Sequence, residues 1–438
     1  MGEVLFTNVR ILDGSGDAPA TGEVLVQGNR IRRVSRGGYG GMAGGARSGG
    51  VGGSGGQTVI DGAGATLMPG LCDAHAHFSW NDQDSLEAIQ RMPPEEHTLF
   101  SAGVAKTYLD MGFTSAVGAA AAKPRLDVVI RNAINAGTIP GPRYLANGQE
   151  IATLGGLGDT SPPHIDIPEL SFGVVVSGAE EMRAVVRRFI KYGVDLLKLN
   201  LSGEEIAGVG AEETPMTDEE AAVAVSEARR RGKRVCAHAR SAESVKMCVR
   251  HGIEIVYHAS FADEEALDML EAQKDRFFVA PGLAWLVMTS SHAEKWGIDP
   301  NGPLALMYKR ELEAAVETMR KMHRRGIRVL PGGDYGFAWT PHGTNAKDLE
   351  YFVEMIGMSP MEAIVSATRY GGQIMGKPDE LGQVREGFLA DLILVDGDPL
   401  SNIRILQDRK RILAVMKDGS FHRAPEVSSQ SRQIRWAS

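Results

Sequence analysis

The sequence predicts an α/β fold in which a (β/α)8 TIM barrel is accompanied by a small β-sandwich domain built from both chain ends. Three observations carry this prediction. Short apolar runs alternate with long helical patterns through the middle of the chain, as in parallel α/β proteins. Eight such runs occur, which is the number of strands in this barrel. Before and after them, apolar and polar residues alternate with the two-residue period of half-buried strands.

The N-terminal part of the β-sandwich is predicted over residues 1–66. Alternating runs fill residues 3–34 and resume at residues 58–62. Between them, residues 37–56 are rich in glycine and serine and lack any apolar period, which indicates a flexible surface loop. This loop does not resemble a phosphate-binding loop, because neither a Lys-Ser/Thr pair nor a helical pattern follows it.

The barrel is predicted over residues 67–384. Its strands are expected at residues 67–78, 113–118, 142–148, 194–200, 234–239, 253–258, 277–281 and 327–334. Helical patterns lie between them at residues 98–111, 126–136, 179–192, 218–231, 242–250 and 309–325. This alternation predicts parallel strands whose carboxyl ends share one rim.

The C-terminal part of the β-sandwich is predicted over residues 385–438, which include the chain's tail. Residues 389–396 and 412–419 alternate again in the strand period. Because the N-terminal strands alone are too few to bury a core, we expect the two ends to pair into one β domain.

The composition argues against several classes of partner. A formal net charge of -8 gives no basic field of the kind that nucleic-acid binding needs. No secretory signal is visible, and no run of about 18 apolar residues predicts a membrane span. Three scattered cysteines, Cys72, Cys236 and Cys248, are typical of reduced thiols, so we expect a cytoplasmic protein. The partner that we expect is a small-molecule substrate.

Two histidines end the first predicted barrel strand. His75 and His77 are two residues apart, so both imidazoles point to the same side of the strand. That arrangement suits the chelation of a divalent metal such as Zn. Taken alone, the pair is equally consistent with two polar residues that merely end a strand.

Four further polar residues lie on other barrel strands. These are Lys198, His238, His258 and Asp334, and each lies at or near the end of its strand. Singly, each has an ordinary explanation: a core histidine, a lysine that reaches the surface, or a turn aspartate. Their joint occurrence on different strands favours convergence at one rim, where the catalytic groups of such barrels lie.

Lys198 lies within an apolar strand, where a protonated ammonium would cost several kcal/mol beside cations and apolar walls. A carbamate formed with carbon dioxide would turn this cation into an anionic oxygen ligand. We expect the carboxylated Lys198 to bridge two divalent metal ions, Zn or alternatively Co or Mn. His75 and His77 with Asp334 would hold one ion, and His238 with His258 the other.

With these residues in place, the chain resembles the amidohydrolase superfamily over nearly its full length. The resemblance rests on residues 68–77, which read MPGLCDAHAH, on the four further polar residues, and on residues 387–395, which read GFLADLILV. It is similar to the binuclear branch with a carboxylated lysine, nearest the dipeptidase and xenobiotic-amide group (ochratoxinase-like, phenylurea- or thiocarbamate-hydrolase-like). The family's usual Ser-Gly-Gly after the lysine is Ser202-Gly203-Glu204 here, which bears on substrate preference more than on metal binding.

The resemblance implies a metal-dependent hydrolase that cleaves an amide-type C–N bond in an amide, carbamate, urea or dipeptide. A metal-bridging hydroxide would attack, and Asp334 would accept its proton and pass it to the leaving nitrogen. The alternatives are a deaminase or cyclic-amide hydrolase of the same superfamily, and a non-catalytic metal-binding scaffold. Lys198 and the absence of a glutamate just after His238 disfavour deamination. Homo-oligomerisation is implied by the resemblance only.

Aromatic and histidine side chains follow predicted strands one, three and eight. They are Trp80, His164, Tyr335, Phe337, Trp339 and His342. Their density suits a flat aromatic or apolar substrate, and a histidine among them could donate a hydrogen bond to the substrate carbonyl. Equally, they could simply cap the barrel.

Overall fold

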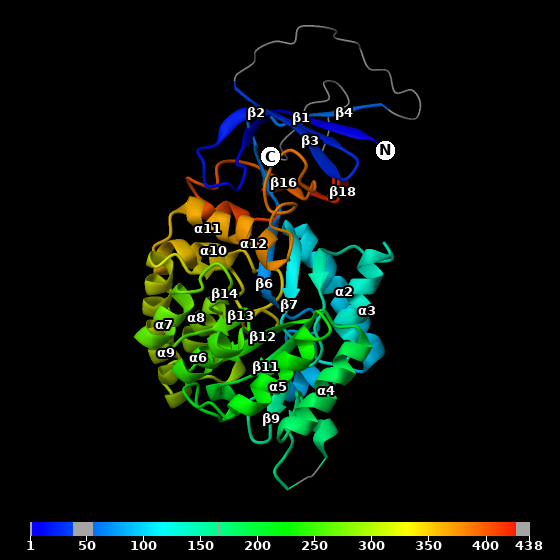
Figure 1. The fold of residues 1–438 in the computed structure, drawn as a ribbon. Coiled ribbons are helices and arrows are strands. Elements are labelled where there is room, and N and C mark those ends of the chain that lie inside the picture. The colour runs from blue at the N-terminus through cyan, green and yellow to red at the C-terminus, as the bar shows by residue number, and fades with distance from the viewer. Residues whose placement is uncertain (1, 38–55, 165–166, 426–438) are drawn as a thin grey trace. The chain divides into compact units, whose positions relative to one another are not determined.

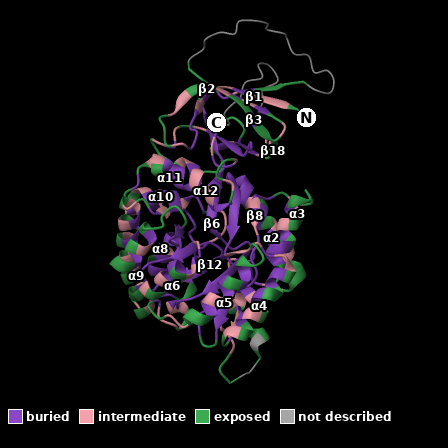
Figure 2. Ribbon diagram, in the orientation of Figure 1, coloured by how far each residue is buried: buried purple, intermediate pink, exposed green. Residues whose placement is uncertain are grey.

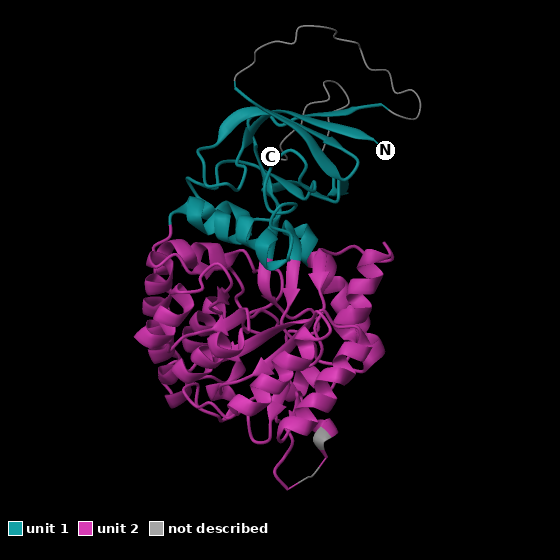
Figure 3. Ribbon diagram, in the orientation of Figure 1, with its two compact units in different colours: residues 1–72, 108–115, 359–438 teal, residues 73–107, 116–358 magenta. Residues whose placement is uncertain are grey.

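A computed structural model describes residues 2–37, 56–164 and 167–425 of the chain (Figure 1). Almost all of the expected Gly/Ser-rich loop, and the C-terminal tail from residue 426, lie outside the described residues. The chain divides into two compact units, residues 1–72, 108–115 and 359–438 in one and residues 73–107 and 116–358 in the other (Figure 3). The sequence-based boundaries at residues 66 and 384 stay predictions.

The first unit contains one eight-stranded sheet, in the order β18-β17-β16-β5-β1-β2-β3 with β4 also paired to β1. Its strands are β1 (Glu3–Ile11), β2 (Ala20–Gln27), β3 (Arg30–Arg36), β4 (Thr58–Asp61), β5 (Thr66–Pro69), β16 (Leu392–Val395), β17 (Ile412–Lys417) and β18 (Ser420–Arg423). The two chain ends meet where β16 pairs antiparallel with β5, and Leu67 and Leu394 share the buried core there. The expected β domain from both ends is confirmed.

A strand occurs at each of the eight predicted barrel positions. These strands lie in the second unit, except that parts of β6 and β7 are assigned to the first unit. The strands are β6 (Leu71–Ala76), β7 (Phe113–Gly118), β8 (Arg143–Leu145), β11 (Leu196–Asn200), β12 (Arg234–Ala239), β13 (Ile255–His258), β14 (Phe278–Ala280) and β15 (Arg328–Val329). Backbone hydrogen bonds close the barrel: Ala74 donates to the Pro331 carbonyl, and Leu196 donates to the Ala146 carbonyl. Figure 2 shows these strands buried, with helices around them that expose their outer faces. The predicted (β/α)8 barrel is confirmed.

Two features of this unit differ from the sequence expectation. The run at residues 67–78 is interrupted at Gly70, so that β5 joins the sheet of the first unit and β6 joins the barrel. Two additional strands, β9 (Ile151–Thr153) and β10 (Val174–Val176), pair beside β11. With three residues each, they are too short to show a two-residue period in the sequence.

The α-helices of the described residues are α1 (Leu86–Gln90), α2 (Pro94–Asp110), α3 (Leu126–Asn135), α4 (Ala179–Tyr192), α5 (Asp218–Arg229), α6 (Ala242–His251), α7 (Glu264–Glu271), α8 (Leu283–Ser291), α9 (Pro303–Arg324), α10 (Lys347–Tyr351), α11 (Pro360–Ala367) and α12 (Arg369–Ile374). The six predicted helical patterns correspond to α2 to α6 and α9, whereas the other helices had no predicted counterpart. Local chemistry sets the starts of helices: Thr217 and Glu220 form a capping box at α5, and proline occupies the first turn of α9. Within the described ranges, no helix has both the length and the apolar character that crossing a membrane requires.

Two helical glycines provide a matched test of packing in this fold. A Cβ added at Gly371 in α12 would lie 2.4 Å from the Cβ of Cys72, whereas one at Gly103 in α2 would meet nothing within 4 Å. We expect Gly371→Ala to lower the free energy of unfolding by about 1–3 kcal/mol through overpacking. Gly103→Ala should raise it by about 0.5–1 kcal/mol, because alanine is the better helix former. Urea unfolding of both variants measures the difference, and equal shifts would contradict the packing argument.

Candidate metal centre and active site

One pocket collects all six side chains that the sequence singled out as metal ligands. His75 lies in β6 with His77 just after it, Lys198 in β11, His238 in β12 and His258 at the end of β13; Asp334 follows β15. All six line the same pocket and are buried. The rim position arises because parallel strands deliver their carboxyl ends to one side of a barrel. Their role as ligands is still a prediction.

Asp334 lies at the centre of the histidine cluster. Its Oδ1 is 3.1 Å from Nε2 of His77 and 3.5 Å from Nε2 of His75. Its Oδ2 is 4.0 Å from Nε2 of His258, whose ring centroid lies 4.4 Å from that of His238. His75, His258 and Asp334 each offer a ligand atom, and these three atoms lie within 4.8 Å of one another. The spacing is short enough for shared metal ions.

Contacts behind two of the imidazole rings fix their orientation. Nδ1 of His77 donates to the Ala120 carbonyl at 2.9 Å, and Nε2 of His238 donates to the Gly203 carbonyl at 2.9 Å. A neutral imidazole that donates from one nitrogen keeps a lone pair on the other, so His77 Nε2 and His238 Nδ1 remain acceptors. Such bonds are the usual support behind metal-ligating histidines.

Several buried polar atoms of the cluster have no hydrogen-bond partner among the described residues. They are His75 Nδ1, His77 Nε2, both ring nitrogens of His258 and Asp334 Oδ1. Buried polar atoms are normally hydrogen-bonded, so a group of unbonded nitrogen and oxygen atoms on residues of one pocket indicates a site for a ligand. Burial lowers the pKa of His75, His238 and His258, which keeps the imidazoles in the neutral form that binds metal. The donor set therefore fits divalent ions that accept nitrogen and oxygen ligands.

The carboxyl of Asp334 remains ionised in this cluster. Burial alone would raise the pKa of Asp334. His75 and His77 lower this pKa by a larger amount, so the net pKa lies below its usual range. Asp334 also has a φ of +64°, a left-handed conformation that aspartate and asparagine tolerate better than most residues. Its carboxylate is thus held at a defined position facing the histidines.

Lys198 is a buried lysine that forms no direct ion pair with another described side chain, although the carboxyl groups of Glu150 and Asp334 interact with it electrostatically. Its side chain is 2% exposed, and its Nζ lies 4.6 Å from the centroid of the Tyr257 ring. Across the described part of the chain, Nζ makes neither a hydrogen bond nor an ion pair with another side chain. The carbamate expected from the sequence stays a prediction for this buried side chain.

The predicted substrate residues fall into two groups. Trp80 and Phe337 line the pocket, and the Trp80 ring stacks on His77 with centroids 3.5 Å apart. The others do not reach the pocket wall. The Tyr335 hydroxyl donates to Asp348, Trp339 Nε1 donates to Thr289, His342 Nε2 lies 2.7 Å from the Trp80 carbonyl, and His164 is exposed. In the loop after β15, Phe337 thus lines the pocket, whereas the polar atoms of Tyr335 and Trp339 bond to residues outside it.

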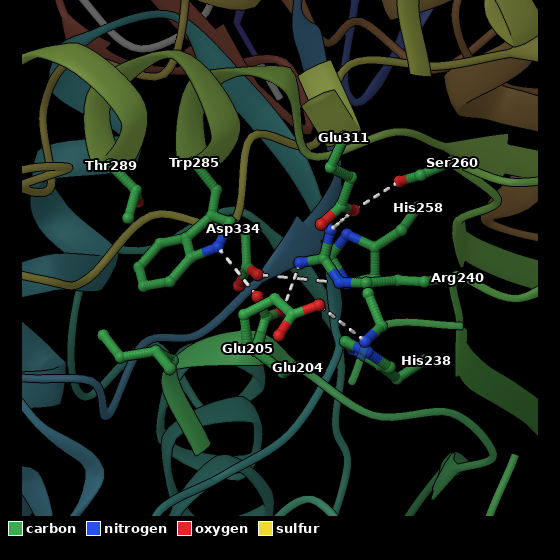
Figure 4. A network of polar contacts seen from close by, with 12 residues as sticks. Glu204, Glu205, His238, Arg240, His258, Ser260, Trp285, Thr289, Glu311 and Asp334 are labelled. Atoms are coloured by element: carbon green, nitrogen blue, oxygen red, sulfur yellow. Dashed lines mark hydrogen bonds and ion pairs between the residues drawn. The ribbon is translucent and has the colours of Figure 1, made fainter. Parts of the chain in front are cut away.

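A buried ionic network beside the pocket was not predicted from the sequence (Figure 4). Arg240, directly after β12, pairs with Glu204 on one side and with Glu311 of α9 on the other. Glu204 lines the pocket, and its Oε1 accepts hydrogen bonds from Tyr308 at 2.5 Å and Trp285 at 3.4 Å. The signal in the sequence was Glu204 itself, which stands where the resemblance leads one to expect glycine.

A second pocket-lining carboxyl, Glu150, directly precedes β9 and was also missed. Burial raises the pKa of Glu150 and that of Glu204 to about 7. The Oε1 atom of Glu150 has no hydrogen-bond partner among the described residues. No periodicity marks a glutamate in such a loop, so only its place in the fold shows that it faces the site.

The chain is similar to a known protein family and to characterised enzymes. A sequence profile described as the amidohydrolase family matches residues 66–421. The chain belongs to this family. Ochratoxinase of Aspergillus niger is 27% identical to this amidohydrolase over 391 residues, which cover 84% of the chain and 78% of that enzyme. Family membership supports a hydrolase.

Solved structures agree with this placement. The crystal structure of a Xaa-Pro dipeptidase with bound methionine in the active site is similar with a TM-score of 0.82 and 28% identity, over 96% of this amidohydrolase and 100% of that chain. The crystal structure of A. niger ochratoxinase gives a TM-score of 0.82 with 22% identity, over 98% of both chains. At that identity, the second likeness shows the fold alone.

The ionic network of this amidohydrolase provides a stability test. We expect Arg240→Met to lower the free energy of unfolding by about 3–5 kcal/mol, because it leaves the buried carboxylates of Glu204 and Glu311 without their cation. Arg310→Met is the matched control, since Arg310 pairs with Glu212 at the surface, where the side chains are 68% and 53% exposed. Chemical denaturation of both variants gives the comparison, and equal losses would contradict a buried role for Arg240.

Proposed function

We propose that this amidohydrolase is a metal-dependent hydrolase that cleaves an amide-type C–N bond of a small substrate, in an amide, carbamate, urea or dipeptide. The observation that carries the proposal is the group of unpartnered ligand atoms on His77, His258 and Asp334 beside the unpaired, buried Lys198. The similarity to an ochratoxinase and to a Xaa-Pro dipeptidase supports the choice of bond.

The proposal keeps the two ligand sets expected from the sequence, although His75, His258 and Asp334, which span both sets, also lie close together. His75, His77 and Asp334 would hold one divalent ion, His238 and His258 a second, and carboxylated Lys198 would be shared; Zn is our first choice, with Co or Mn as alternatives. Bound ions of this kind lower the pKa of a water molecule toward neutrality and polarise a carbonyl group.

Side chains of the protein would transfer the proton and bind the substrate. Asp334 would take a proton from the attacking water, hold it on Oδ2, and deliver it to the leaving nitrogen. Trp80, Trp285 and Phe337 line the pocket with aromatic rings that would hold a flat part of the substrate and exclude bulk water. His77 and His238 need no rearrangement, because backbone carbonyls already orient their rings.

The test is a screen of metal-loaded protein against acyl anilides, dipeptides, aryl ureas, carbamates and cyclic amides, with metal content measured on the same samples. We expect an amine product from at least one linear amide and more than about one metal ion per chain. Ammonia release or ring opening alone would favour the deaminase or cyclic-amide alternatives. Full metal content without turnover of any substrate would favour the scaffold alternative.

A further inference from the structure

The pocket wall beyond the predicted ligands has an uneven charge distribution. Two carboxyl groups line it, those of Glu150 and Glu204. Among the lining residues that the structure describes, Lys198 alone is a lysine or arginine, and the proposed carbamate would remove its positive charge. The remaining lining residues are apolar or aromatic: Trp80, Leu86, Leu157, Ile206, Trp285 and Phe337.

Arg240 does not offset these charges toward the pocket. It is fully buried, with 0% of its side chain exposed, and it lies between Glu204 and Glu311 rather than on the pocket wall. One guanidinium between two carboxylates leaves this group with a net negative charge when all three are ionised. On this wall, away from the proposed metal ions, a substrate carboxylate would therefore lie beside like charges and meet no free guanidinium.

Glu150 offers an open acceptor. Its residue is 4% exposed, it lines the pocket, and its Oε1 has no hydrogen-bond partner in the described chain. Gly158 borders this oxygen, and a Cβ there would lie only 2.6 Å from Oε1, so the glycine leaves the carboxyl room. The carboxyl group also interacts with Lys198 and Asn200. A buried oxygen that lacks a donor, on a residue that lines a pocket, is still expected to receive one from a ligand.

We propose that this amidohydrolase selects amide substrates that carry an ammonium group near the scissile bond and discriminates against those with a carboxylate there. The ammonium would donate to Oε1 of Glu150, while Glu204 adds to the negative field. The aromatic rings of the wall would also attract a cation. This inference rests on the proposed function and names its substrate class.

Three 4-nitroanilides that carry the same isobutyl group and differ in the substituent on the α-carbon test the proposal on metal-loaded protein. The leucyl compound carries an α-ammonium, the 4-methylpentanoyl compound carries no charge, and the isobutylmalonyl compound carries an α-carboxylate. After correction for uncatalysed hydrolysis, we expect kcat/KM to be at least about tenfold higher for the first than for the second, and lower still for the third. Equal values, or a preference for the carboxylate, would overturn the inference.

Glu150→Gln is the decisive variant, because it keeps the size and removes the charge. We expect it to lose most of the leucyl preference while it still hydrolyses the neutral anilide. Glu95→Gln, on the exposed first turn of α2, is the matched control and should keep the preference. A preference that is unchanged in Glu150→Gln would overturn the assignment to Glu150.

Calorimetry separates this inference from the proposed function. Metal-loaded wild-type protein should bind benzylammonium at least about tenfold more tightly than neutral benzyl alcohol, whether or not any anilide is hydrolysed. Absence of all turnover would reject the proposed function, whereas equal binding or tighter binding of benzyl alcohol would reject the selection of cations. The measurement also decides the matter if Glu150→Gln does not fold.

Discussion

Asp334→Asn should keep most of the bound metal and lose turnover by about 10²–10⁴-fold, the usual contribution of a positioned general base. The carboxylate lies 3.1 Å from His77 Nε2 and is held ionised by its histidine neighbours, so it can accept a proton at neutral pH. Asparagine keeps one oxygen for the metal but cannot accept and return a proton. Asparagine also suits the φ of +64° at this position, so the backbone should not move.

The control for this prediction is Asp334→Ala, which removes the oxygen ligand and places an alanine in the left-handed region. We expect it to lose both metal and stability, whereas Asp334→Asn should lose turnover alone. Metal analysis, thermal unfolding and initial rates on the same preparations separate the two cases. Wild-type turnover in Asp334→Asn would show that the proton acceptor lies elsewhere.

The barrel could be predicted from the sequence because each strand is a short apolar run between helical patterns, and topology then fixes which ends meet. Lys198, His238, His258 and Asp334 are far apart in the chain, yet they lie at one rim because parallel strands deliver them there. The strands β9 and β10 could not be predicted, since three residues do not define a period.

The residues that support the site are brought together by tertiary contacts that no local sequence pattern records. Arg240 and Glu204 are 36 residues apart, and Arg240 and Glu311 are 71 apart, so only the closed barrel brings them together. Tyr335 and Trp339 were expected at the substrate, but their polar atoms are bonded to Asp348 and Thr289 behind the pocket. Aromatic density in a loop does not show which way the loop turns.

Lys198→Met should remove most of the metal and reduce turnover by more than about 10²-fold, because loss of a direct ligand should exceed the 10–100-fold effect typical of groups that only support one. Methionine has similar length and suits the apolar surroundings of β11, so the fold should persist. The exposed Lys274 provides the control, and Lys274→Met should leave metal content and turnover unchanged.

The same lysine distinguishes a carbamate from an ordinary ammonium. If the carbamate forms, wild-type apoprotein reconstituted in buffer freed of carbon dioxide should take up less metal than protein reconstituted with bicarbonate. Lys198→Met should show no such dependence, because it has no amine to react. Equal metal uptake by wild-type protein in both buffers would contradict carboxylation. It would also leave the buried, unpaired Nζ of Lys198 as a cation that the rest of the pocket would have to compensate.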